Sequence, residues 1–348
     1  MKRAHSLAVA QVVPQGSDAV LLSFTLTDDQ AAQFRFQPGQ YLTLAADIGG
    51  QAQWRCYSIT SEPQPGSPIS VLVRRVAGGR VSNWICDHAQ PALRLQVLPP
   101  AGRFLLARPG AAALLFAGGS GIAPIYALAR QALAAGAPRV GLFYANRDRA
   151  TTMLTDELDA LQRAAGARLA LRYWFDAEDG LPAPQSLAEQ ARGFETADVY
   201  LCGPDAFMRA VGSGLAQAGF DATRVHREDF GAPADDGDAG AEPDVGVGDD
   251  ADGRAAGPAV TMTVTLGAQQ HVVAVGPRQS LLSAMLDAGL PVPHACKVGE
   301  CASCICRLEE GQVERLDNSV LDEDDVADGW VLACRTRALG TPVRIRFN

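Results

Sequence analysis

The stretch CKVGECASCICRLEE, residues 296–310, holds four of the eight cysteines of this chain. Cys296, Cys301 and Cys304 have the spacing C-x4-C-x2-C, and Cys334 follows in the segment WVLACRTRA. Clustered thiols of this kind can be metal ligands, a disulfide framework or unrelated residues.

The spacing favours metal ligation. Three cysteines as C-x4-C-x2-C with a distant fourth is the plant-type pattern of thiolates around a 2Fe-2S cluster. A structural zinc site would usually bring a second CxxC or histidines, whereas Cys334 stands alone. Cys306 alternates with Cys304 on an expected strand and is therefore predicted to point into the core.

The surroundings of the cysteines predict a small domain of their own. VTMTVTL and HVVAV alternate as a hairpin, and SLLSAMLDAGL predicts a helix with Ser280 near its start. Gly299 and Ala302 leave the backbone of the cysteine loop uncrowded, so its N–H groups could approach the cluster sulfurs.

Composition limits the remaining possibilities. The 348 residues, 47% hydrophobic, are enough for two to three ordinary domains. No basic surplus suits nucleic acid, no apolar run is long enough for a membrane span, and the first residues lack the apolar region of a secretory signal. We expect a cytoplasmic protein, and a reducing compartment also favours metal-bound thiols over disulfides.

The net charge of -9 is concentrated in residues 231–258. This segment is rich in Asp, Gly, Ala and Pro and has almost no large apolar side chain, so it predicts a flexible linker. The alternative is an acidic surface loop within one domain. The linker interpretation divides the chain into residues 1–107, 108–230, 231–258 and 259–348.

The first two of these regions differ in pattern. Up to about residue 105, short apolar or alternating runs separated by Gly- and Pro-rich turns predict an antiparallel β-barrel. From residue 111 strands alternate with helices, which predicts an α/β doubly wound parallel sheet. The expected barrel strands are VLLSFTL, QYLTLAAD, WRCYSITS and ISVLVRRV.

Two motifs in the barrel region suit a phosphate-containing cofactor. Arg55, Tyr57 and Ser58 combine a guanidinium, a flat ring and a hydroxyl, although RxYS also fits a half-exposed strand. The run from Gly78 to Ser82 places glycine-freed N–H groups before an expected helix, as a pyrophosphate cradle would. A plain turn with a Ser N-cap is the alternative.

Two further motifs follow strands of the parallel sheet. The run Ala117–Pro124, AGGSGIAP, opens a helix and could accept a dinucleotide, although it is not GxGxxG. Leu201-Cys202-Gly203-Pro204 lies at the carboxyl end of the last clear strand, where open α/β sheets bind ligands. Cys202 there is either an inert buried thiol or a neighbour of a nicotinamide ring.

Taken in order, FQPGQYL, RCYSITS, LVRRVAGGRVSNWI, AGGSGIAP, LCGP and HREDF resemble the ferredoxin-NADP reductase superfamily over about residues 5–230. Residues 259–348 resemble a β-grasp ferredoxin. The resemblance implies an FAD barrel, an NAD(P) domain and a 2Fe-2S domain, and the second phosphate cradle favours FAD over FMN. The implied FAD site comprises Arg55, Tyr57, Ser58, Val73, Arg74, Gly79, Arg80, Val81 and Ser82.

The same resemblance implies the nicotinamide site and the cluster ligands. The cluster ligands are Cys296, Cys301, Cys304 and Cys334. Ser58, Cys202 and Glu228 are expected to shape the contact between nicotinamide and flavin. The other implied cofactor-binding residues are Gly119, Ser120, Gly121, Pro124, Gly203, Pro204 and Phe230.

Joined together, these sites predict a reductase that takes a hydride from NAD(P)H and passes single electrons to a 2Fe-2S cluster, with FAD between them. The domain order resembles reductase components of oxygenase systems, among them the phenylacetyl-CoA epoxidase and ketosteroid hydroxylase groups. This implies a diiron or Rieske oxygenase as partner. The alternatives are another acceptor, such as a hybrid-cluster protein or a cytochrome, and a redox sensor without turnover.

The choice between NADH and NADPH stays open at the segment Tyr144–Arg149. Arg147 or Arg149 could meet a 2′-phosphate, whereas Asp148 could favour a free ribose hydroxyl. A solvated charged turn is the third possibility.

Overall fold

The computed structural model describes residues 4–64, 66–228, 259–316 and 320–347. The expected linker and Phe230 therefore lie outside the described residues. The chain divides into two compact units, which are described separately: one holds the barrel and the parallel sheet, and the other holds the cysteine-rich region. Among the described helices, none is long and apolar enough to cross a membrane.

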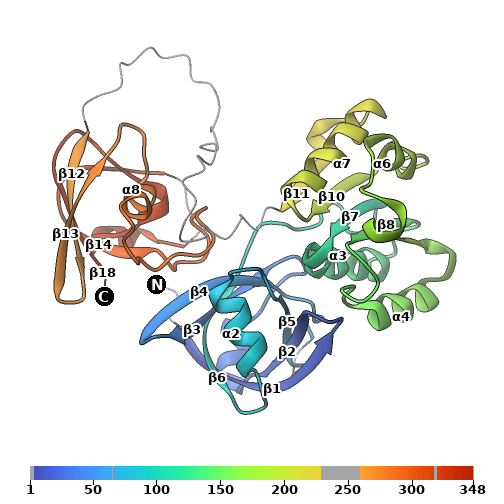
Figure 1. The fold of residues 1–348 in the computed structure, drawn as a ribbon, viewed down its shortest axis with the longest axis horizontal. Helices are drawn as coiled ribbons and strands as arrows, with labels where there is room; N and C mark the ends of the chain where they lie inside the picture. Colours follow the sequence, from blue (N-terminus) through green and yellow to red (C-terminus); the bar gives the residue numbers. More distant parts are fainter. Residues whose placement is uncertain (1–3, 65, 229–258, 317–319, 348) are drawn as a thin grey trace. The chain divides into compact units, whose positions relative to one another are not determined.

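The first unit begins with a six-stranded antiparallel sheet in the order β4-β3-β6-β1-β2-β5 (Figure 1). An isolated antiparallel bridge between Ile59 and Val71 joins the end of β4 to β5, which closes the sheet into a barrel. The predicted barrel is thus confirmed. Its strands are β1 (His5–Gln15), β2 (Ala19–Thr25), β3 (Tyr41–Ile48), β4 (Gln51–Ser58), β5 (Ile69–Arg74) and β6 (Arg94–Ala101).

Two helices accompany the barrel. Helix α1 (Asp28–Gln33) begins after Thr27 with a capping box that involves Gln30. Helix α2 (Arg80–His88) buries Val81, Ser82 and Ile85. The barrel interior is filled by alternate apolar residues of the strands, such as Leu22, Phe24, Val71 and Val73.

The second half of this unit is a five-stranded parallel sheet in the order β11-β10-β7-β8-β9. The doubly wound prediction is confirmed. The strands are β7 (Ala113–Gly118), β8 (Val140–Asn146), β9 (Leu169–Phe175), β10 (Asp198–Cys202) and β11 (Val225–Glu228). The helices are α3 (Ile122–Ala134), α4 (Thr155–Ala165), α5 (Asp176–Asp179), α6 (Pro184–Gln190) and α7 (Asp205–Gln217).

The parallel sheet is buried on both faces. Leu115 and Ala117 of β7 belong to a core with helices α3 and α4, whereas Leu114 and Phe116 belong to a core with α6 and α7 (Figure 1). Strand order reverses between β7 and β10, because the chain moves outward through β8 and β9 and then returns to the other side of β7. The carboxyl ends of β7 and β10 therefore form the switch point of the sheet, where ligands of such folds bind.

The barrel and the parallel sheet share one of these cores. Ala19, Leu72, Phe104 and Leu106 from the barrel side are buried in the same apolar cluster as helix α3. Gln15 extends this contact, because its Oε1 accepts a hydrogen bond of 2.8 Å from the Leu154 amide. A shared core of this kind holds the two folds in one fixed arrangement.

The second unit has a mixed sheet in the order β13-β12-β18-β14-β16 and a small pair, β15 with β17. Helix α8 (Leu281–Asp287) packs its buried face on this sheet, and the Ser280 side chain accepts from the Ser283 amide at its start. The strands are β12 (Val260–Leu266), β13 (Gln269–Val275), β14 (Ile305–Glu310), β15 (Val313–Arg315), β16 (Trp330–Leu332), β17 (Thr336–Ala338) and β18 (Val343–Phe347), and α9 is Glu323–Ala327.

Candidate functional site

The end of strand β4 carries the first predicted site residues. Ser58 is buried, and Arg55 and Tyr57 are half-buried. The Tyr57 hydroxyl oxygen is shielded from solvent but has no hydrogen-bond partner in the described part of the chain, and burial raises the pKa of Tyr57. A bound cofactor could supply the missing partner, so this strand fits a flavin-type ligand.

The predicted phosphate cradle falls in the turn from β5 into helix α2. Gly79 is the residue before the helix, and a Cβ there would lie 2.6 Å from the Ser82 Oγ. Arg80 is exposed. Val73 and Val81 are buried in the barrel core, so only their backbone could contact a cofactor.

The glycines at the switch point have a reason that the sequence alone does not reveal. A Cβ on Gly121 would lie 2.1 Å from the Cys202 carbonyl oxygen, and one on Gly203 would lie 2.9 Å from the Gly118 Cα. The turn after β7 and the turn after β10 thus pack backbone against backbone. Their glycines are required by this contact, in addition to any approach of a dinucleotide.

The other predicted nicotinamide residues are at the same edge. Cys202 is fully buried and pairs in register with Ala117 on one side and Glu228 on the other. Pro124 is buried in the first turn of helix α3, and Pro204 precedes helix α7. The structure therefore brings Cys202 and Glu228 together at the carboxyl end of the sheet.

A polar cavity of about 670 Å³ lies between the barrel and the parallel sheet. Arg74 approaches the switch point here, because a Cβ on Gly119 would lie 2.6 Å from its Nη1. Ser120 and Arg147 line the cavity from the sheet side. Its remaining lining residues are Asp18, Arg75, Val76, Ala77, Asn83 and Asp87.

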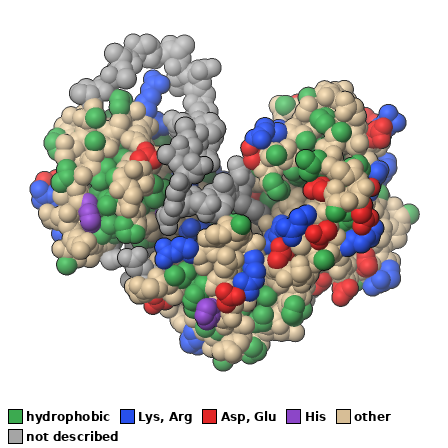
Figure 2. Space-filling model, in the orientation of Figure 1, with side chains coloured by type: hydrophobic (Ala, Val, Ile, Leu, Met, Phe, Trp, Pro, Cys, Tyr) green, Lys and Arg blue, Asp and Glu red, His purple; other side chains and the backbone are tan. Residues whose placement is uncertain are grey.

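The cavity contains paired charges. Asp18 Oδ2 accepts from Arg74 Nε at 3.2 Å, and Asp87 Oδ1 accepts from Arg75 Nη2 at 2.6 Å. The hydrogen bond from Arg75 lowers the pKa of Asp87 and keeps this carboxyl ionised. Figure 2 shows basic and acidic side chains interspersed over the visible face of this unit.

In the second unit, the four predicted cluster ligands lie as two pairs. Cys304 Sγ is 3.2 Å from Cys334 Sγ, and the Cys296 amide donates to Cys301 Sγ at 3.4 Å. Each of Cys301, Cys304 and Cys334 is buried, and Cys296 is half-buried. The neighbouring Cys304 thiol raises the pKa of Cys334, and the charges of Cys296 and Cys301 add to that effect.

This arrangement fits a two-iron cluster better than a single ion. Among the described residues, no three Cys, His, Asp or Glu side chains are placed to hold one metal ion. Two thiol pairs offer two ligands to each of two irons, which is the four-thiolate set of a 2Fe-2S centre. Backbone amides also face the sulfurs, since Glu300 N–H donates to Cys296 Sγ at 3.4 Å.

Cys306 is separate from this group. It lies on strand β14, has no exposed surface and belongs to the apolar core of the second unit. The predicted core position of this cysteine is confirmed.

Comparison with known proteins finds three domain families in successive parts of the chain. Residues 7–105 match the oxidoreductase FAD-binding domain, residues 115–213 the oxidoreductase NAD-binding domain, and residues 264–339 the 2Fe-2S iron-sulfur cluster binding domain. The ferredoxin reductase component of 3-ketosteroid-9-alpha-monooxygenase from Rhodococcus rhodochrous is 36% identical, over 99% of this chain and 97% of the relative. The chain belongs to the family of oxygenase reductase components.

Two further similarities agree with this assignment of the reductase. A component of the 1,2-phenylacetyl-CoA epoxidase of Escherichia coli K12 is 32% identical, over 99% of the reductase and 98% of that component. The structure of phthalate dioxygenase reductase, described as modular for electron transfer from pyridine nucleotides to 2Fe-2S, aligns with a TM-score of 0.61 and 25% identity, over 99% and 98% of the two chains. The reductase is thus an oxidoreductase with FAD, NAD and 2Fe-2S domains.

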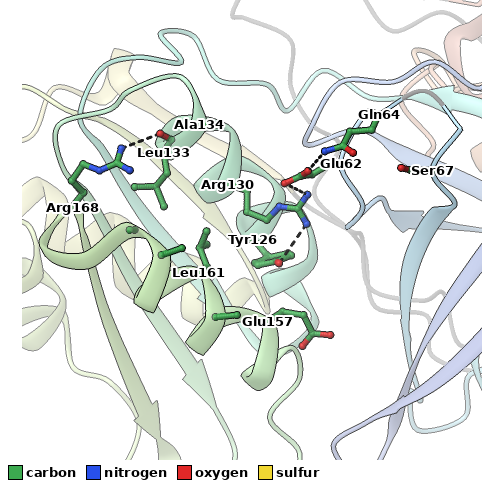
Figure 3. A pocket seen from close by; sticks show the side chains of 13 residues that line it. Glu62, Gln64, Ser67, Tyr126, Arg130, Leu133, Ala134, Glu157, Leu161 and Arg168 are labelled. Atoms are coloured by element: carbon green, nitrogen blue, oxygen red, sulfur yellow. Dashed lines mark hydrogen bonds and ion pairs between the residues drawn. The ribbon is translucent and has the colours of Figure 1, made fainter.

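Some residues that organise the reductase carry no sequence motif. Figure 3 shows Arg130 of helix α3 between Glu62, in the loop after β4, and Tyr126. Arg130 Nη2 forms an ion pair with Glu62 Oε1 at 2.8 Å, and its Nη1 donates to the Thr60 carbonyl at 3.2 Å. Sequence reasoning missed Arg130, Gln15 and Asp18, because each has a partner 56 to 142 positions away along the chain.

Proposed function

We propose that this protein oxidises NAD(P)H and delivers the electrons singly to an oxygenase on another chain. The observation that carries the proposal is the presence of all three domains in one chain, with Arg74 of the barrel against Gly119 at the switch point of the parallel sheet. When bound, FAD accepts two electrons together and releases them one at a time. The chain's own residues bind, orient and shield the reacting groups.

On the flavin side, the proposed binding residues lie along the ends of β4 and β5 and the start of α2. Arg55 would neutralise phosphate, Tyr57 would pack on the ring and Ser58 would donate its hydroxyl proton to a ring nitrogen. The burial of Ser58 supports this role, because water is kept from that end of the strand. The other proposed residues are Val73, Arg74, Gly79, Arg80, Val81 and Ser82.

On the nicotinamide side, the turns after β7 and β10 would hold the dinucleotide. Cys202 and Glu228, which are register neighbours, would border the nicotinamide and keep it aligned with the flavin. Gly119, Ser120, Gly121, Pro124, Gly203 and Pro204 are the other residues proposed here. Phe230 keeps its proposed place near the flavin on the resemblance alone.

In the second unit, Cys296, Cys301, Cys304 and Cys334 are the proposed cluster ligands. Their two-pair arrangement and the amide from Glu300 support this assignment. We also propose the domain limits 1–107, 108–230, 231–258 and 259–348, and a cytoplasmic location, where thiols stay reduced.

The proposed partner is an oxygenase, because the relatives are named as monooxygenase and epoxidase components. Its proposed class, Rieske or diiron, rests on the resemblance alone. The test is NAD(P)H oxidation by the loaded protein with each class of oxidised oxygenase, compared with a dye as acceptor. A Cys304→Ala variant should retain dye reduction and lose transfer to the oxygenase. Equal loss with both acceptors would contradict the proposed order of electron transfer.

A further inference from the structure

The segment after strand β8 carries the candidate groups for distinguishing NADPH from NADH. Arg147 and Arg149 are the two cations in this segment. A 2′-phosphate distinguishes NADPH from NADH and carries a charge of about −1.5 to −2 near pH 7. Recognition of NADPH therefore needs a guanidinium or ammonium group whose charge is not already balanced.

Arg149 is held away from this task by its own contacts. Its Nε and Nη2 donate to the two carboxylate oxygens of Glu178 at 2.7 and 2.9 Å. Its guanidinium also lies over the Phe175 ring, 4.3 Å from the ring centre. Among the described residues that line the polar cavity, Arg149 is absent.

Arg147 does line the cavity, but two carboxylates share its charge. Its Nε donates to Asp148 Oδ2 at 3.2 Å, and its Nη2 is 3.8 Å from Asp18 Oδ2. Asp148 is itself fixed, because it accepts hydrogen bonds from the amide and the hydroxyl of Thr151 at 2.8 and 2.9 Å. The positive charge of Arg147 is thus balanced by one carboxylate from the parallel sheet and one from the barrel.

Asp18 reaches this position because the hairpin between β1 and β2 is fastened to the parallel sheet. The Ser17 amide donates to the Ala150 carbonyl at 2.8 Å, and a Cβ on Gly16 would lie 2.8 Å from the same oxygen. Asp18 Oδ2 is shared between Arg74 and Arg147, whereas its Oδ1 has no hydrogen-bond partner in the described residues. One carboxylate is therefore shared by two guanidinium groups, which leaves neither of them free for a phosphate.

Every described arginine that lines the cavity is paired in this way. Arg74 pairs with Asp18, Arg75 with Asp87, and Arg147 with Asp148 and Asp18. A 2′-phosphate would have to displace a carboxylate or lie beside one, and like charges a few ångströms apart repel. A ribose hydroxyl meets no such repulsion, and carboxylates are its usual partners in NAD sites.

We propose that the protein oxidises NADH in preference to NADPH, and that Asp18, a barrel residue, is a specificity-determining residue through its position beside Arg147. This inference rests on the proposed function. It places the selection partly in the flavin domain, outside the domain that binds the dinucleotide.

The test is anaerobic flavin reduction by NADH and by NADPH in the full-length, FAD-loaded protein. We expect kcat/KM for NADH to exceed that for NADPH by about tenfold or more, equivalent to about 1.4 kcal/mol. Asp18→Asn should lower this ratio by about fivefold, chiefly through a lower KM for NADPH, because it removes a repulsive charge. Asp18→Glu retains the charge and should keep the preference.

Glu309→Gln is the matched control, since it removes the same charge from beside an arginine, Arg346, and neither residue is among those that line the cavity. In this control, the ratio of kcat/KM for NADH to kcat/KM for NADPH should stay within about twofold of the value for the unmutated protein. Because both nucleotides are measured in one preparation, any change in FAD content cancels in the ratio. The unmutated protein tests the preference for NADH even if a variant fails to fold. A preference for NADPH, or an unchanged ratio in Asp18→Asn, would overturn the inference. Flavin reduction by neither nucleotide would overturn the proposed function, and this inference with it.

Discussion

Arg130 of helix α3 and Glu62 of the loop after β4 form an ion pair of 2.8 Å that joins the nucleotide domain to the flavin domain. The Arg130 side chain is largely buried, at 17% exposed, and also donates to the Thr60 carbonyl, two residues beyond Ser58. The pair thus connects the helix that follows the glycine turn with the strand end proposed to contact the flavin.

Arg130→Met should therefore weaken the interface. We expect a loss of about 1–2 kcal/mol in the free energy of unfolding of the first unit, because the Thr60 carbonyl loses a charged donor. Flavin reduction should also slow. Thermal unfolding followed by flavin release, with stopped-flow reduction, measures both.

Arg168→Met is the control for this prediction. Arg130, Glu62 and Arg168 line one groove (Figure 3), but Arg168 is exposed and donates to the Leu133 carbonyl within the nucleotide domain. Its effect should remain below about 0.5 kcal/mol. Similar losses in both variants would show that Arg130 has no special role between the domains.

Gly121→Ala should disrupt the switch point. The new Cβ would lie 2.1 Å from the Cys202 carbonyl oxygen, and a backbone atom cannot move aside as a flexible side chain would. We expect a cost of about 3 kcal/mol or more and loss of NAD(P)H oxidation. Denaturant unfolding and turnover measure the two effects.

Gly136→Ala separates this clash from backbone strain. Gly136 has a φ of +87°, and a Cβ there would meet nothing within 4 Å. The substitution therefore costs only the strain of an alanine in the left-handed conformation, about 1 kcal/mol. If Gly121→Ala lowered the free energy of unfolding no more than Gly136→Ala, the result would contradict the close contact between the two turns.

Cys304 and Cys306 make a matched pair two residues apart. Cys304→Ala should abolish the visible absorption of the 2Fe-2S cluster, because it removes one of four thiolates. Cys306→Ala should retain that absorption and cost about 1 kcal/mol through the lost buried sulfur. Loss of the cluster in Cys306→Ala with the fold intact would place Cys306 among the ligands.

Cys86 should react slowly with alkylating reagents at neutral pH. Burial raises its pKa to about 11, since the thiolate is disfavoured there. The alkylation rate, measured by mass spectrometry of the Cys86 peptide, should rise by about tenfold per pH unit up to that value.

The raised pKa of Cys86 also makes the stability of the folded state decrease at alkaline pH. In the unfolded chain a cysteine ionises near pH 8.5, so between about 8.5 and 11 only the unfolded state releases the proton and the folded state loses stability. A Cys86→Ser variant should lack this part of the alkaline decrease. Alkylation of Cys86 at pH 7 as fast as that of a free thiol would contradict the raised pKa.

The features that sequence reasoning predicts well depend on local pattern. Period-two runs indicate the barrel strands, the alternation from residue 111 indicates the parallel sheet, and the spacing of Cys296, Cys301 and Cys304 indicates the cluster loop. Helix α6 has no such signal, because its seven residues carry too short an apolar pattern.

What sequence reasoning cannot supply depends on contacts between distant residues. In the sequence Asp18 is part of an ordinary hairpin turn, and only the structure shows that it lies beside Arg147. Arg147 and Arg149 are equivalent candidates in the sequence, and only the contacts of Arg149 with Glu178 and Phe175 distinguish them. The motifs around Gly121 and Gly203 indicate room for a ligand, whereas the structure shows that these glycines also make room for each other's turns.

Strand β18 is the last of its sheet to be synthesised, yet it occupies the central position between β12 and β14. A ribosome must therefore release residues 343–347 before this sheet can close around the buried thiols. The barrel and the parallel sheet need no residue of that strand and can form earlier in translation. Completion of the core that holds Cys304 and Cys334 is thus a late step in the folding of this protein.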